Sequence, residues 1–185
     1  MLRNRQTERR YQQMNTGQNN LKDVVGIGNA MVDILASADE AFLAEHGLAK
    51  GGMTLVDASQ ATEIHEAMGP GVEMSGGSVG NTMAGLASLG GTGSYIGKVR
   101  DDQLGGTFHN DLELLGISFS TAPALDSSPT ARCLIIVTPD GQRSMATYLG
   151  ACVELGPEDI DADTIQSHRV TYLEGYLWDA PQAKE

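Results

Sequence analysis

Apolar runs and amphipathic segments alternate along most of the chain, and glycine turns separate them. Runs rich in Val, Ile and Leu predict strands, whereas apolar residues three or four positions apart predict helices. The predicted strands are 22–28, 53–57, 72–75, 93–99 and 170–176, the last of which is expected to be buried. The predicted helices are 38–48, 61–68 (capped by Ser59), 107–115 and the small-residue stretch after Gly77, where Val79, Met83, Leu86 and Leu89 share one face. This alternation predicts an α/β fold with a parallel sheet.

The pattern changes from Ile117 onward. Residues 131–137 and 142–149 are apolar runs on either side of Thr138-Pro139-Asp140-Gly141, which predicts a β-hairpin outside the parallel sheet. Residues 29–36 are extended or turning and carry a carboxylate, Asp33, within an apolar run. A short acidic helix is expected at Pro157.

Residues 1–20 are polar and contain no apolar segment of the kind found in secretory signals. We interpret residues 1–21 as a disordered leader and residues 22–185 as one domain. No apolar run approaches the length of a membrane span. The only cysteines are Cys133 and Cys152, without a disulfide-dense pattern, which favours a cytoplasmic location.

The charge is strongly acidic, with a net value of −12 that is unevenly distributed. The first 22 residues hold five of the twelve basic residues, which leaves 23 acidic and 7 basic residues in the remainder. Nucleic-acid binding requires a basic surface, so this composition argues against a nucleic-acid partner. An anionic substrate would require a local exception to the negative field.

The stretch Gly76-Gly77-Ser78-Val79-Gly80-Asn81 combines paired glycines with the start of a helix. Amides at a helix start have no partner within the helix, so they can face a polar ligand. The side chain of Asn81 can both donate and accept hydrogen bonds, as a sugar hydroxyl requires. A plain glycine turn before a close-packed helix explains the same pattern, so this stretch alone does not decide.

Three motifs occur in order: Gly28-Asn29-Ala30-Met31-Val32-Asp33-Ile34, Gly76-Gly77-Ser78-Val79-Gly80-Asn81-Thr82 and Ile96-Gly97-Lys98-Val99-Arg100-Asp101-Asp102-Gln103-Leu104-Gly105. The first does not fit a dinucleotide-binding fingerprint, because Met31 stands where a third glycine is needed. Together they resemble the PfkB, or ribokinase-like, family of carbohydrate kinases, and most closely its adenosine-kinase-like branch. The resemblance covers residues 22–185 and only the N-terminal portion of the family's fold.

The resemblance implies a ribokinase-like parallel sheet flanked by helices, with a small β-sheet lid over the substrate. It implies phosphoryl transfer from ATP, with Mg²⁺, to a hydroxyl of a sugar or nucleoside, with an adenosine-like substrate favoured. The family's substrate-binding positions match Asn29, Asp33, Gly76, Gly77 and Asn81. A carboxylate can accept bonds from two neighbouring hydroxyls, although Asp33 could instead cap a turn.

The lid would be built from residues 50–57 and 117–151. A homodimer could form through it, and its closure would exclude water from the substrate. Arg143 is a candidate contact on the phosphate side, or a solvated surface residue. Met145 and Leu149 could pack on a base or form hairpin core.

Two motifs of the family are absent from the sequence: Asn-x-x-Glu, which organises magnesium and phosphate, and Gly-Ala-Gly-Asp, which supplies the catalytic base. We therefore assign no catalytic residue and no metal ligand, and expect the chain to lack the catalytic and ATP-binding half. Asp101-Asp102 is interpreted as a structural loop, and the four histidines have no ligand spacing. The alternative functions are a non-catalytic or partner-dependent sugar- or nucleoside-binding protein, and an α/β domain without a ligand.

Overall fold

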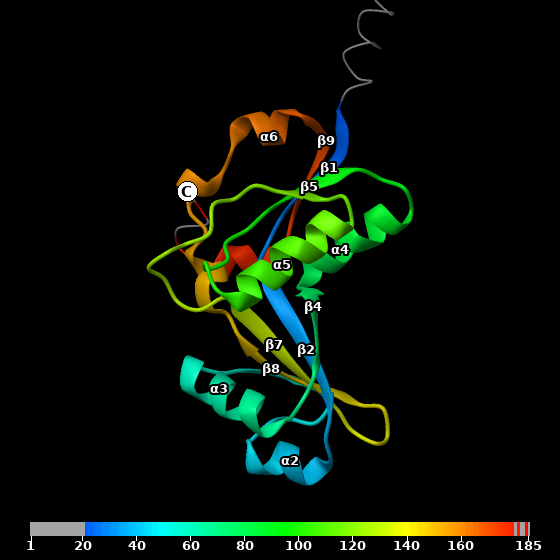
Figure 1. The fold of residues 1–185 in the computed structure, drawn as a ribbon, viewed down its shortest axis with the longest axis vertical. Helices are drawn as coiled ribbons and strands as arrows, with labels where there is room; N and C mark the ends of the chain where they lie inside the picture. The colour runs from blue at the N-terminus through cyan, green and yellow to red at the C-terminus, as the bar shows by residue number, and fades with distance from the viewer. Residues whose placement is uncertain (1–20, 180, 182–183, 185) are drawn as a thin grey trace, which may run out of the picture.

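The structure is a computed structural model that describes residues 21–179, 181 and 184. The predicted leader lies outside the described residues except for Leu21. The chain forms two sheets (Figure 1). Strands β2 (Met31–Ser37), β7 (Ala131–Val137) and β8 (Arg143–Tyr148) run toward one end of the molecule, where α2 (Glu40–Glu45) and α3 (Ala58–Ala67) lie. Helices α4 (Ser78–Ser88) and α5 (Gln103–Leu114) lie at the other end of these strands.

The first sheet is parallel throughout, which confirms the predicted α/β class. Its strand order is β6 (Ser118–Phe119), β5 (Gly93–Ile96), β1 (Lys22–Ile27) and β9 (His168–Leu173). Helices α4 (Ser78–Ser88) and α5 (Gln103–Leu114) pack beside it and contribute Val79, Met83, Phe108 and Leu112 to the main core. Parallel strands need such helical crossovers, so the first sheet has the expected architecture.

The second sheet is mixed. Its order is β3 (Met53–Leu55), β8 (Arg143–Tyr148), β7 (Ala131–Val137), β2 (Met31–Ser37) and β4 (Val72–Gly76). Strands β7 and β8 are antiparallel, which confirms the predicted hairpin. Residues 29–36, left above as extended or turning, supply β2, which joins β7 to β4.

One face of the second sheet is buried and the other is partly open. In β2 the buried residues Val32, Ile34 and Ala36 alternate with the more exposed Met31, Asp33 and Leu35. This buried face belongs to the same hydrophobic core as Leu43 of α2 (Glu40–Glu45) and Ile64 of α3 (Ala58–Ala67). Side chains alternate across a strand, so Asp33 lies on the open face.

Short helical turns cover the remaining face of the first sheet. They are η1 (Gly150–Glu154), η2 (Pro157–Asp159), α6 (Ala162–Gln166) and η3 (Gly175–Asp179). Leu155 and Leu177 pack there against Val25, Ile27 and Ile96. The ammonium of Lys98, which follows β5, lies 2.5 Å from the carboxylate of Asp159 and fixes η2. Within the described part of the chain, no helix has both the length and the apolar character that a bilayer crossing demands.

Several local predictions were wrong at element ends. The cap of α3 is Asp57, not Ser59, because Asp57 and Gln60 form a reciprocal capping box. Helix α5 begins at Gln103 rather than Thr107, because Asp102 accepts a hydrogen bond from the Gly105 amide. This confirms the structural interpretation of Asp102.

Leu89 and strand β9 are more exposed than the sequence pattern suggested. Leu89 is 89% exposed because it follows the last turn of α4. Strand β9 was predicted to be buried, but Val170 and Leu173 are exposed because only β1 pairs with it. The lid segments 50–57 and 117–151 stay a prediction as a domain boundary. Within the second range, β6 pairs with β5 in the first sheet.

Candidate functional site

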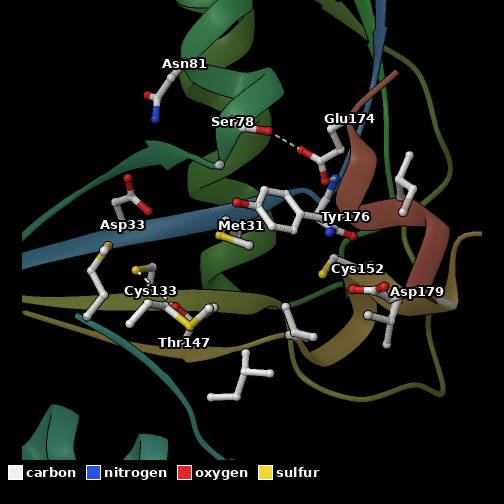
Figure 2. Close-up of a pocket in the computed structure, with 18 of the residues that line it drawn as sticks. Met31, Asp33, Ser78, Asn81, Cys133, Thr147, Cys152, Glu174, Tyr176 and Asp179 are labelled. Carbon is white, nitrogen blue, oxygen red and sulfur yellow. Dashed lines mark hydrogen bonds between the residues drawn. The ribbon is translucent and has the colours of Figure 1, made fainter. Parts of the chain in front are cut away.

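A cavity of about 480 Å³ lies between the ends of the first sheet and the open face of the second (Figure 2). Its polar lining residues include Asn29, Asp33, Ser78, Asn81, Glu174 and Asp179. They come from the turn after β1, from β2, from the first turn of α4, and from the end of β9 and η3. Parallel strands commonly bring such groups to one edge, where ligands bind.

Asp33 stands on the open face of β2, opposite Met74 of β4 and beside Cys133 of β7. No residue from 21 to 179 donates a hydrogen bond to its carboxylate. Burial raises the pKa of Asp33 from 3.8 to about 6, because the charged form loses contact with water. Asp33 is therefore a partly buried acceptor without a partner, directed into the cavity.

Gly76 permits the approach of this carboxylate to α4. A Cβ atom built on Gly76 would overlap the carboxyl group of Asp33. Gly77, the N-cap residue of α4, has a φ of 78°, and a Cβ there would lie 2.8 Å from the carbonyl oxygen of Asn29. Only glycine satisfies both the backbone conformation and the close contacts at this turn.

The first turn of α4 opens onto the same cavity. No side chain caps this helix, so its first amides lack the usual acceptor. Asn81 lies on this turn, and Figure 2 shows Asp33 and Asn81 along the same side of the cavity. The structure thus brings Asp33, Gly77 and Asn81 to one site, as the sequence motifs predicted. Their binding roles remain predictions.

Glu174, at the end of β9, connects three elements of the site. One carboxylate oxygen accepts a hydrogen bond from the Asn29 amide at 2.6 Å, and the other accepts one from the Ser78 hydroxyl at 2.5 Å. The side chain is buried. Sequence reasoning noted Glu174 only as part of a strand. Its position in a run of Leu and Tyr could have signalled a partnered buried carboxylate.

Much of the remaining cavity lining is apolar. It includes Met31, Ile135, Met145, Leu149, Leu155 and Leu177. Met145 and Leu149 line the cavity, which leaves contact with a base a prediction, whereas Arg143 does not line it. Arg143 is exposed at the start of β8, opposite Val137 and next to the hairpin turn.

The cavity also contains two thiols and a tyrosine that the sequence did not single out for a site. Cys133 and Cys152 are buried and unpaired, and burial raises their pKa values to about 11 and about 12. The thiols are therefore protonated near neutral pH and serve as apolar lining. The exposed Tyr176 of η3 lines the cavity, and Figure 2 shows its ring projecting across it.

The described residues do not fit an ATP–magnesium complex by themselves. Across residues 21–179 no three His, Cys, Asp or Glu side chains are grouped to hold a metal ion. The cavity lining contains no Lys, Arg or His within the described part of the chain to contact phosphates. What the lining offers instead is hydrogen-bond acceptors, helix amides and apolar surface, which suit a polyol joined to a flat apolar group.

The two-sheet α/β fold and this cavity define a ribokinase-like architecture. Residues 46–183 match the pfkB family carbohydrate kinase, and the chain belongs to this family. An adenosine kinase from Sinorhizobium meliloti superimposes with a TM-score of 0.81 and 57% sequence identity, over 88% of this chain and 50% of that chain.

Curated relatives have different substrates in their names. The guanosine-inosine kinase of Escherichia coli strain K12 is 25% identical over an alignment 171 positions long, which covers 83% of this chain and 37% of the relative. An ATP-dependent ribose-1-phosphate kinase from Halopiger xanaduensis is 33% identical over 92 residues, which are 50% of this chain and 31% of the relative. The chain thus spans half or less of the length of these three proteins.

Proposed function

We propose that this chain binds the acceptor of a kinase that transfers a phosphoryl group from ATP to a hydroxyl of a nucleoside, with an adenosine-like nucleoside favoured. Asp33 would accept bonds from two neighbouring ribose hydroxyls, and Asn29, Gly76, Gly77 and Asn81 would complete the polar contacts. The single observation that carries the proposal is the partly buried, unpartnered Asp33 beside the uncapped first turn of α4 in the cavity lining.

The apolar wall favours a nucleoside over a free sugar. A purine base could cover Met145, Leu149 and the ring of Tyr176, whereas a sugar would leave them in contact with water. The 57% identity to an adenosine kinase points the same way. A cytoplasmic location, consistent with the two unpaired thiols, is part of the proposal.

ATP and Mg²⁺ belong to the proposal through the family. Catalysis of phosphoryl transfer depends on cationic groups around the moving phosphate. Because the described lining supplies none, we propose that the groups that bind ATP and the catalytic base lie outside it, and that the chain alone is inactive.

Isothermal titration of the chain with adenosine, inosine, ribose and fructose tests the proposal. We expect adenosine to bind and the Asp33→Ala variant to lose at least about tenfold in affinity, because two hydroxyl contacts to a charged acceptor disappear. Equal heats for both proteins would reject the assigned site. Glu66→Gln on the exposed face of α3 is a control that should not change binding.

A second candidate is a binding protein that works with a partner polypeptide. The outer edge of β9 is unpaired among the described strands, and Val170, Leu173 and Trp178 nearby are exposed. A homodimer through the second sheet is likewise proposed, supported by the exposed Leu55, Val72 and Met74. Sedimentation equilibrium separates a dimer from a monomer.

A further inference from the structure

The charge in the cavity is of one sign. Three carboxylates line it, those of Asp33, Glu174 and Asp179, and no Lys, Arg or His side chain does so within the described residues. Lys98, the first basic residue after β5 in the sequence, is paired with Asp159. Any ligand in the cavity therefore experiences a negative potential that no lining side chain offsets.

The first turn of α4 brings partial positive charge to this site. A helix N-terminus is equivalent to roughly half a positive charge. Glu174 accepts a hydrogen bond from Ser78 in this turn, and Asp33 faces the same end of the helix. Two carboxylates outweigh the helix terminus, so the turn does not form an anion site.

Asp179 differs from the other two carboxylates. Glu174 is held by Asn29 and Ser78, and Asp33 stands within a sheet, whereas Asp179 is exposed at the end of η3 and no bond within residues 21–179 is recorded for it. Figure 2 shows it across the cavity from Asp33. Its charge faces the cavity, and among residues 21–179 no hydrogen bond or ion pair holds it in place.

We propose that Asp179 is a specificity-determining residue that, together with Asp33 and Glu174, makes the cavity reject acceptors that already carry a phosphate. Unit charges about 8 Å apart in a partly buried site alter an equilibrium constant by more than about tenfold, and a phosphate carries nearly two charges. An unphosphorylated nucleoside avoids this repulsion. The inference extends the proposed function, since it separates nucleosides from sugar phosphates, the class named in the ribose-1-phosphate kinase relative.

The first experiment compares adenosine with AMP, and ribose with ribose 5-phosphate, by isothermal titration at pH 8. We expect each phosphorylated ligand to bind at least about tenfold more weakly than its neutral counterpart. Asp179→Lys should reduce this ratio at least about threefold, and Glu66→Lys on α3 should leave the ratio unchanged. A wild-type ratio near one, or a ratio insensitive to Asp179→Lys, would overturn the proposal.

The second experiment needs no natural ligand, so it separates this inference from the proposed function. A reporter thiol is placed in the cavity by Tyr176→Cys and on the outer surface by Leu89→Cys, and both are alkylated with neutral iodoacetamide and anionic iodoacetate. The cavity reporter should disfavour iodoacetate at least about threefold more than the surface reporter, and about 1 M salt should remove the difference. If adenosine fails to bind but this difference appears, only the proposed function fails. Equal reagent ratios at the two reporters would overturn the charge discrimination itself.

Discussion

The two sheets contribute to the cavity in different ways. The first sheet places backbone amides and Glu174 through contacts that are buried and hydrogen-bonded, with Val79 and Met83 packed completely beneath them. The second sheet offers side chains from one open face, such as Met53 and Leu55, which are 52% and 59% exposed. The buried, hydrogen-bonded groups beside the first sheet can therefore fix hydrogen-bond geometry, whereas the open face of the second sheet presents apolar surface that a ligand could cover.

The largest effect is expected at the glycine turn that joins the two sheets. Gly76→Val forces a side chain into the Asp33 carboxylate, so it should destabilise the fold by about 2 kcal/mol or more and abolish nucleoside binding. Urea unfolding and titration measure both. Gly85→Ala, in the following helix α4 with open space around the position, is the control. It should stabilise the protein by up to about 1 kcal/mol. Equal stability of both variants would contradict the close approach.

The second-largest effect is expected at Glu174, which connects the end of β9 to the turn after β1 and to α4. Glu174→Ala leaves the Asn29 amide and the Ser78 hydroxyl without their acceptor, which should cost about 2 kcal/mol. Glu174→Gln retains one acceptor oxygen and should cost about half as much. Thermal and urea denaturation provide the measurement. If both variants unfold like the wild type, Glu174 does not tie these elements together.

The third effect is a pH dependence at Asp33, a residue of β2 in the second sheet whose carboxyl group lies against Gly76. Its pKa in the folded state, about 6, lies above its ordinary value of 3.8, so protonation favours the folded state. This contribution to stability is complete below pH 3.8 and is lost as the pH rises through 6. Adenosine affinity should change in the opposite direction, rising between pH 5 and pH 7 as the carboxylate ionises.

Asp33→Asn separates these two consequences. It should remove the pH dependence of binding near pH 6, and at pH 7 it should stabilise the unliganded protein by about 1 kcal/mol, an amount reduced by solvent screening. Titration calorimetry and urea unfolding at pH 5, 6 and 7 report both. A pH profile of binding that is identical in wild type and variant would show that another group titrates.

The smallest effect on stability is expected on the open face of the second sheet. Met145→Ala should lower stability by less than about 1 kcal/mol because its side chain is half-buried, whereas Met83→Ala in the core should cost about 2–5 kcal/mol. Met145→Ala should nevertheless weaken adenosine binding more than ribose binding. A similar loss for both ligands would indicate that the apolar wall does not contact a base.

Local sequence patterns anticipated many of these elements. The hairpin followed from its Pro-Asp-Gly turn and the flanking apolar runs, and α4 from the spacing of Val79 and Met83 after two glycines. Errors occurred where a neighbouring residue competed locally, as when Asp57 rather than Ser59 capped α3. The burial of β9 was mispredicted because an apolar strand sequence does not report how many neighbours the strand has.

What the sequence determined by itself was the set of groups near Gly76 and Asp33, since turns, helix starts and strand periodicity are short-range properties of the chain. Only the tertiary structure brought Glu174 to Asn29, across 145 positions of the chain, and placed Asp179 and Cys152 in the same cavity. Pairing of β9 with β1 creates that proximity, and strand pairing depends on the packing of the whole sheet rather than on any local pattern.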